Sequence, residues 1–293
     1  GDVYKRQLFF GAGLSKSLDD LGAQGSPPEN AELLEALASS FVASEWDVKR
    51  LVRAIVTSQA YRRSSSGAQS TMEKDLENRF FARQNSWRLP AESLRDTALA
   101  NCGLLNRSMR GAPVKPYQPA GYYQHLNFPK REYVADKTPN QWRRGVYMHW
   151  QRQFLHPMLR AFDAPSREEC TAQRPRSNTP LAALVLLNDP TFVECARELA
   201  TLTLQQPLRE ESERIAFAFS QVTGRCPSET EREVIGKFLQ ECVANYRDDD
   251  DAAKKLLAIG SSGVNGDFDR KQLAAWTATC RLLFNLSEAV TRE

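Results

Sequence analysis

Residues 142–196 read WRRGVYMHWQRQFLHPMLRAFDAPSREECTAQRPRSNTPLAALVLLNDPTFVECA, and two prolines in this stretch set the expected fold. Each follows a residue suited to helix capping, because Thr179 precedes Pro180 and Asp189 precedes Pro190. Proline at the first helical position lacks an N–H that would be unpaired anyway, while a Thr or Asp side chain accepts from the free amides that follow. The stretch therefore predicts two successive helices, over residues 180–187 and 190–204.

The first of these helices has the sequence PLAALVLL, which is apolar on every side. A helix that is apolar all round is expected to be buried in the core. Leu184 and Leu187 are therefore predicted to be almost fully inaccessible to solvent.

The loop ahead of this helix is the main candidate site, and it is rich in arginine. From residue 141 to residue 180 there are seven arginines against three acidic residues. A helix N-terminus offers free N–H groups and partial positive charge, so arginines beside it would complete a site for a carboxylate, sulfate or phosphate. The candidate residues are Asp163, Arg167, Glu168, Arg174, Arg176, Asn178 and Thr179.

The same residues also fit a structural role. The arginines would then pair with the acidic residues of the loop, because an irregular segment needs side-chain partners for its backbone groups. Pro165 disfavours helix at the preceding residue, so a charged turn is expected there. We predict that Asp163 contacts Arg174 or Arg176 and that Phe162 packs beneath it.

The rest of the chain predicts an all-α, multi-helix globular domain with long irregular loops. Its 293 residues are 41% hydrophobic, which allows a substantial core, and Leu and Ala recur at helical spacing. Any β-structure is expected to be short and confined to the Pro- and aromatic-rich residues 111–135. The other predicted helices cover residues 32–43, 48–61, 73–85, 91–104, 141–154, 211–224, 228–247, 252–259 and 271–286.

Composition excludes several classes of function. The net charge is only +3, and the basic character is local, so no nucleic-acid partner is expected. No segment approaches the ~18 continuous apolar residues that a membrane span needs. The six cysteines include no C-x-x-C pair, no C-x-x-C-H haem motif and no zinc-ligand spacing. We therefore expect no haem, metal or other cofactor in this chain.

Three further groups of side chains are weaker candidates. Glu92 and Asp96 are four residues apart on one helical face, where paired carboxylates can serve glycoside cleavage, although nearby arginines more often bridge such pairs. His149 and His156 suit proton transfer or metal binding, but neither has a partner at ligand spacing, which favours a structural role. The remaining group would form either a carbohydrate platform or a plug that fixes the loop: Tyr117, Tyr122, Tyr123, Phe128 and Tyr133.

Long motifs resemble a known family. FDAPSREEC and RPRSNTPLAALVLLNDPTFVECARELA lie in the central stretch, and other matching pieces are FGAGL, AELLEALASSFV, WDVKRLVRAIVTSQAYRRSS, ENRFFARQNSWRLPAESLRDTALANCGLL, PYQPAGYY and LAAWTATCRLLFNLSEAVTRE. Together they are similar to the planctomycete domain of unknown function 1553, DUF1553. Asn30-Ala31 stands where the family usually has His-Pro, and Ala182 stands where it usually has Gln, which argues against essential polar roles at those positions.

The resemblance implies a cellular context but no activity. Family members form the C-terminal part of large secreted proteins that often carry a cytochrome-c-like domain. An extracytoplasmic location, periplasmic or secreted, is therefore expected. Residues 1–7 read as a translated sequencing-adapter artefact ahead of an N-terminally truncated fragment that shows no signal peptide. Residues 8–293 are expected to form one DUF1553-like domain, with a sub-boundary near residues 105–140.

Two functions remain open on this basis. The first is a binding or scaffolding module beside redox or polysaccharide-processing domains, with a polysaccharide or another domain of the full-length protein as its partner. The alternative is an enzyme acting on a polysaccharide, sulfated or not, through arginine and carboxylate residues of the central loop. A pocket that gathers Asp163, Arg174, Arg176 and His156 would favour the enzyme, and arginines tied in salt bridges would favour the module.

Overall fold

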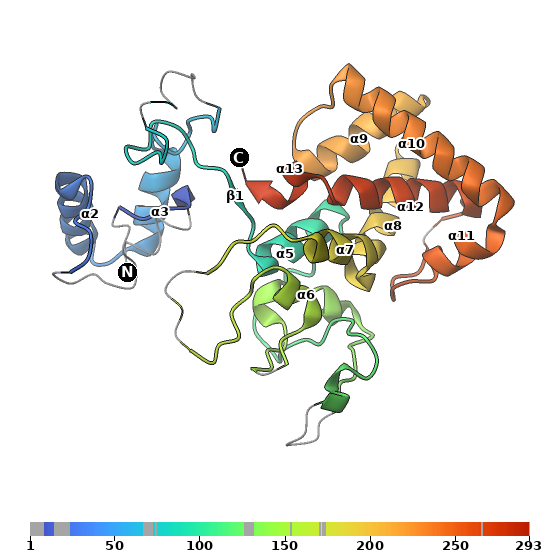
Figure 1. Ribbon diagram of the computed structural model, residues 1–293, viewed down its shortest axis with the longest axis horizontal. Helices are drawn as coiled ribbons and strands as arrows, with labels where there is room; N and C mark the ends of the chain where they lie inside the picture. The colour runs from blue at the N-terminus through green and yellow to red at the C-terminus, as the bar shows by residue number, and fades with distance from the viewer. Residues whose placement is uncertain are drawn as a thin grey trace. The chain divides into compact units, whose positions relative to one another are not determined.

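The computed structural model describes residues 9–14, 24–66, 73, 75–125, 132–152, 154–169, 171, 174–264 and 266–292. The expectations about residues 1–7 and Phe128 lie outside these ranges. The described chain is mostly helical, with long irregular segments between the helices, which confirms the all-α prediction (Figure 1). It divides into two compact units: Gly1–Arg88 with Thr171–Gln173 and Thr291–Glu293, and Leu89–Cys170 with Arg174–Val290. The division falls at Arg88, N-terminal to the stretch where the sequence suggested a sub-boundary.

The first unit contains a pair of helices, α2 (Ala31–Ala43) and α3 (Val48–Thr57). Each begins at a side-chain cap, with Asn30 accepting from the amide of Leu33 and Asp47 accepting from the amides of Lys49 and Arg50. Phe10, Leu51 and Ile55 form the small buried core of this unit. Strand β1 (Trp87–Arg88) pairs antiparallel with β2 (Thr291–Arg292), so the only sheet among the described residues lies outside 111–135. Within 111–135, where β-structure was expected, Val114 forms an isolated β-bridge with Met148.

The helix predicted over residues 73–85 is wrong from residue 75 onward. Residues 75–85 form turns because polar side chains take up the backbone groups that a helix would use. Asp75 accepts from the amides of Arg79 and Phe80, and the buried Asn78 side chain donates to the carbonyl of Arg83.

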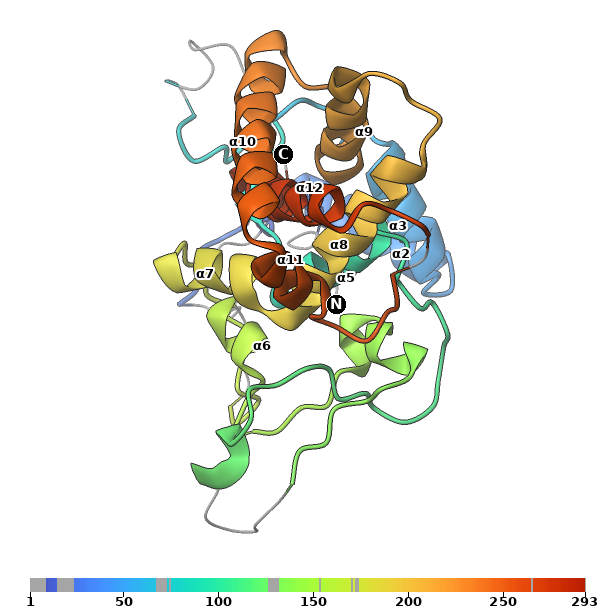
Figure 2. The same ribbon diagram turned by 90° about the vertical axis from the view of Figure 1, so that its right-hand side faces the viewer.

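The second unit is built around three long helices, α8 (Pro190–Gln205), α10 (Glu229–Asp248) and α12 (Arg270–Phe284). Helix α12 packs between α8 and α10 in both views (Figures 1 and 2). Most side chains of α8 are buried, including Phe192 and Leu199, and α12 contributes Leu273 and Leu283 to the same core. The helices of this unit are α5 (Ala91–Asn101), α6 (Pro157–Ala161), α7 (Pro180–Asn188), α8 (Pro190–Gln205), α9 (Glu211–Thr223), α10 (Glu229–Asp248), α11 (Asp250–Leu257), α12 (Arg270–Phe284) and α13 (Ser287–Val290).

The predicted N-terminal ends of α7 and α8 are confirmed. Pro180 and Pro190 sit in the first turns of these helices, capped by Thr179 and Asp189. The predicted burial of α7 is wrong, because Leu184 is 55% exposed and Leu187 is partly exposed. Only one face of the short helix packs on its neighbours, so it buries Ala182 and Leu186 and leaves the opposite leucines in solvent.

The helix predicted over residues 141–154 is also wrong. The chain forms short 3-10 turns there, η2 (Pro139–Trp142) and η3 (Gly145–Tyr147), after an earlier turn η1 (Tyr122–His125). The reason is the fully buried guanidinium of Arg95 on α5, which donates to the carbonyls of Gln141 and Arg143. An α-helix would commit those two carbonyls to its own amides.

Candidate functional site

Asp163, the central residue of the predicted anion site, is held by a serine rather than by an arginine. It adopts a left-handed backbone conformation, with φ of 58°. Its carboxylate accepts from the amide of Ser177 at 2.6 Å and from the Ser177 hydroxyl at 2.8 Å. The predicted contact with Arg174 or Arg176 is therefore wrong. Phe162 is buried beneath the turn and meets Phe192 edge to face at 6.1 Å.

Arg174 instead pairs with Glu92 of α5. Its Nη1 atom lies 3.0 and 2.9 Å from the two carboxylate oxygens. Asp96, one turn along α5, accepts from the amide of Gly145 at 2.6 Å, and burial raises the pKa of this carboxyl. The two carboxylates considered as an acid/base pair are thus engaged with different partners, and both fasten irregular segments to α5.

The other predicted residues of the loop have separate surroundings. The Arg167 guanidinium stacks over the ring of Trp150, with its central carbon 3.8 Å from the ring centre. Glu168, Arg176 and Asn178 are exposed, and Thr179 caps α7 by accepting from the amide of Ala182 at 3.3 Å. These contacts tie the loop to the protein at several points.

His156 has a structural role at the start of α6. It is 3% exposed, and its Nδ1 accepts from the amide of Met158 at 3.3 Å. Its Nε2 therefore carries the proton and donates to the carbonyl of Tyr117, 2.5 Å away. Burial lowers the pKa of His156 to about 4. The backbone amide of His149 donates to the carbonyl of Val114 at 2.7 Å.

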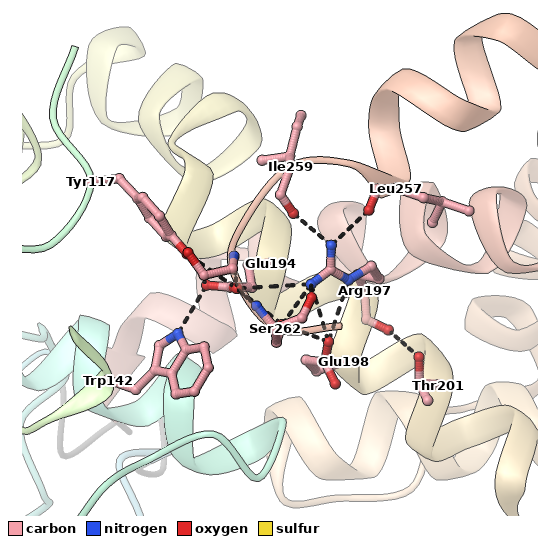
Figure 3. A network of polar contacts seen from close by, with 10 residues as sticks. Tyr117, Trp142, Glu194, Arg197, Glu198, Thr201, Leu257, Ile259 and Ser262 are labelled. Atoms are coloured by element: carbon pink, nitrogen blue, oxygen red, sulfur yellow. Dashed lines mark hydrogen bonds and ion pairs between the residues drawn. The ribbon is translucent and has the colours of Figure 1, made fainter. Parts of the chain in front are cut away.

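A buried polar network centred on Glu194 was missed by sequence reasoning (Figure 3). This residue of α8 is 0% exposed. Its carboxylate accepts from the Tyr117 hydroxyl at 3.0 Å and from the Trp142 indole N–H at 2.9 Å. It also accepts from the amides of Ser261 and Ser262 at 2.6 and 2.7 Å, and from the Ser262 hydroxyl at 2.9 Å. Burial, with the adjacent Glu194 charge, raises the pKa of Tyr117 to about 12.

Arg197, one turn further along α8, extends this network to the C-terminal end of α11 (Figure 3). It is 2% exposed and donates to the carbonyls of Leu257 at 2.7 Å and Ile259 at 2.6 Å. Its Nη2 lies 3.8 Å from the Glu194 carboxylate and 3.3 Å from that of Glu198. The buried cation therefore has both carbonyl and carboxylate partners.

The connection between α11 and α12 passes close to the Glu194 carboxylate, and a glycine makes this close approach possible. Gly260 has φ of 102°, a region that L side chains rarely adopt. A Cβ atom there would lie 2.5 Å from Glu194 Oε1. Glycine lets the chain approach the carboxylate closely enough for the next two amides to donate to it.

Tyrosines of the Pro- and aromatic-rich stretch, residues 111–135, also direct their hydroxyl groups toward the protein interior. The Tyr122 hydroxyl donates to the carbonyl of Leu155, and the Tyr133 hydroxyl donates to that of Pro116. Tyr123 packs edge to face on Tyr133 and Phe154. With Tyr117 bound to Glu194, the arrangement matches a plug that fixes the loop rather than an open carbohydrate platform.

Together these contacts describe an interior in which the Glu194 carboxylate and the Arg197 guanidinium are both buried and paired. The Glu194 carboxylate is inaccessible and accepts on both oxygens, so it has no free oxygen with which to act as a base. Among the described residues, no group of three or more His, Cys, Asp or Glu side chains could hold a metal ion. In the same part of the chain, no helix is both long and apolar enough to cross a membrane.

Comparison with known proteins identifies the family and no closer relative. No curated protein matches the chain, and no solved structure matches it. A family model described as "Protein of unknown function (DUF1553)" matches residues 6–239, which is most of the chain. The match extends through both compact units as far as α10. The chain therefore belongs to the DUF1553 family.

Proposed function

We propose that this chain is a non-catalytic helical module that binds or scaffolds a partner. One observation carries the proposal: three charged groups of the central loop, those of Asp163, Arg167 and Arg174, make contacts inside the protein. Arg174 is paired with Glu92, Asp163 is bound by Ser177, and Arg167 is stacked on Trp150. Such contacts order a loop, and an enzyme of the alternative kind needs these groups turned toward a substrate.

The proposal extends to the setting of the module. The chain resembles a family whose members form the C-terminal part of large secreted planctomycete proteins, often together with a cytochrome-c-like domain. We accordingly propose an extracytoplasmic location and a role beside redox or polysaccharide-processing domains. The support for this setting is the resemblance of the motifs FDAPSREEC and RPRSNTPLAALVLLNDPTFVECA to the family.

Replacing Asp163 tests the structural role of the loop. Asp163→Ala removes the acceptor for the Ser177 amide and hydroxyl, which should lower the free energy of unfolding by about 2 kcal/mol, as for hydrogen bonds to a charged group. Denaturant titration of the wild type, Asp163→Ala and Ser177→Ala measures this effect. Ser177→Ala is the matched variant, because it keeps the backbone amide contact and should show a smaller loss.

Activity assays on variants of the two α5 carboxylates distinguish the module from the enzyme. The wild type, Glu92→Gln and Asp96→Asn are incubated with sulfated and unsulfated polysaccharides, and released reducing ends are counted. The module releases none. Release by the wild type that disappears in Glu92→Gln without a change in melting temperature would overturn the proposal in favour of the enzyme.

A further inference from the structure

The corner between α2 and α3 in the first unit presents an exposed tryptophan. Trp46 is 65% exposed. Glu45 and Trp46 both have positive φ, of 54° and 63°, which is uncommon for two consecutive residues other than glycine. The amide of Trp46 donates to the carbonyl of Phe41 at 3.0 Å, and the two rings meet edge to face at 5.3 Å. The strained corner therefore holds the indole in a fixed position while most of its surface stays open to solvent.

Three cations follow the tryptophan on the outer side of α3. Lys49, Arg50 and Arg53 are exposed, and their spacing of three and four residues places them on neighbouring positions of one helical face. Within the described part of the chain, none of the three forms an ion pair. The opposite face of α3 buries Leu51 and Ile55 in the small core.

We propose that this corner is a docking surface for an anionic polysaccharide. The C–H face of a sugar ring stacks on Trp46, and sulfate or carboxylate groups of the polymer pair with Lys49, Arg50 and Arg53. The inference rests on the proposed function as a binding module, and it names the surface and the class of ligand. Arginine suits this role because its planar fork of donors matches the oxygens of a sulfate or carboxylate.

The same surface fits other polyanions less well. Nucleic acid carries dense charge and needs a sustained basic face, whereas here Glu45 and Asp47 are exposed on either side of Trp46. A membrane surface is bound by a helix that inserts its apolar face, and α3 already packs Leu51 and Ile55 of that face into the small core, which leaves Val48 as its one exposed large apolar side chain. A polysaccharide with separated charges needs only one aromatic platform and a few unpaired cations.

Binding to dextran sulfate tests the proposal, with uncharged dextran as the control polymer. Titration calorimetry on the full chain should show salt-dependent binding of dextran sulfate and no binding of dextran. Trp46→Ala and the double variant Arg50→Glu/Arg53→Glu should each weaken binding at least tenfold. Trp46→Phe, which keeps an aromatic face, should retain most of the affinity and controls for loss of folding.

A matched charge control separates this surface from general ion exchange. Arg209→Glu/Lys237→Glu changes the net charge by the same amount at exposed positions in the second unit, and it should leave binding unchanged. Equal losses in the two double variants, an unchanged Trp46→Ala, or no binding at all would each overturn the proposal. So would tighter binding of a single-stranded oligothymidine or of anionic phospholipid vesicles through the same residues.

Counting reducing ends in the calorimetry samples keeps the two proposals distinguishable. Cleavage of the polymer by the wild type would contradict the non-catalytic function and leave the docking surface standing. Intact polymer with binding that is insensitive to Trp46 would contradict the docking surface alone.

Discussion

At the scale of single residues, Glu194 is the side chain whose loss should be felt most. Glu194→Gln places an amide N–H₂ among groups that already donate, and it removes the charge opposite the buried Arg197 guanidinium. Breaking a buried, hydrogen-bonded ion pair costs about 3–5 kcal/mol. We expect a loss of that size in the free energy of unfolding, measured by urea titration.

The matched control for this change is Glu241→Gln, an exposed glutamate on α10. It should alter stability by less than about 0.5 kcal/mol, as surface substitutions usually do. If Glu194→Gln were as mild as this control, the network in Figure 3 would contribute little to the fold.

His156 should make stability depend on pH in a defined direction. The unfolded chain protonates this histidine below about pH 6.5, whereas the folded protein does so only below about pH 4. Between these values the unfolded state holds more protons, so the contribution is complete above pH 6.5 and is lost as the pH falls toward 4. The difference amounts to about 3 kcal/mol.

His156→Asn supplies the comparison, because asparagine can still cap α6 and does not titrate. Melting curves recorded from pH 4 to pH 7.5 should show a shallower loss of stability on the acid side for the variant than for the wild type. Parallel curves for the two proteins would mean that His156 is not held neutral by burial.

At the scale of the elements, α7 offers a matched pair of leucines. Leu186 is 4% exposed and Leu184 is 55% exposed, two residues apart in the same helix. Leu186→Ala should lower the free energy of unfolding by about 2–5 kcal/mol, because it empties part of the core. Leu184→Ala should stay within about 0.5 kcal/mol of the wild type. Similar losses at both positions would show that α7 is buried on both faces after all.

The contrast between these leucines shows that the sequence predicted where α7 begins but not which of its faces is buried. Thr179-Pro180 and Asp189-Pro190 predicted where α7 and α8 begin, because capping is a local property. The faces that α7 buries depend on which helices lie beside it, and an all-apolar sequence carries no information about that. Residues 141–154 failed as a helix for a similar reason, since the demand for their carbonyls comes from Arg95, almost fifty residues earlier.

The same limit applies to the candidate site. Sequence reasoning chose the arginines of the loop and paired Asp163 with one of them, but it had no means of ranking Arg174 against Ser177 as a partner. Glu194 carries no sequence signal for burial. Glu194, Arg197, Glu198 and Thr201 recur at helical spacing and form a polar stripe on α8, and such a stripe usually faces solvent. In the fold, Tyr117 and the α11–α12 connection cover this stripe, so its charges must be paired.

At the scale of the whole molecule, the two compact units differ in the size of their cores. Phe10, Leu51 and Ile55 form the core of the first, while the core of the second runs through α5, α8, α9, α10 and α12. Segments with few buried contacts open at lower free energy. Hydrogen exchange measured by mass spectrometry should therefore show faster exchange in α2 and α3 than in α8 and α12.

Core substitutions refine this prediction. Leu51→Ala should speed exchange in α2 and α3 and leave α8 unchanged, because the units have separate cores. Leu199→Ala should instead speed exchange across α8 and α12. Uniform acceleration by Leu51→Ala would indicate that the chain unfolds as one cooperative body.

The wide spacing of the partners of Glu194 has a consequence for the chain as it is synthesised. Tyr117 and Trp142 leave the ribosome before α8 does, but Ser261 and Ser262 follow Glu194 by 67 and 68 residues. At the usual pace of translation that delay is roughly 3–13 s. For that interval a nascent chain holds Glu194 and Arg197 with half of their partners missing, and water has to serve in their place. We therefore expect the charged face of α8 to become buried only after the α11–α12 connection has been synthesised.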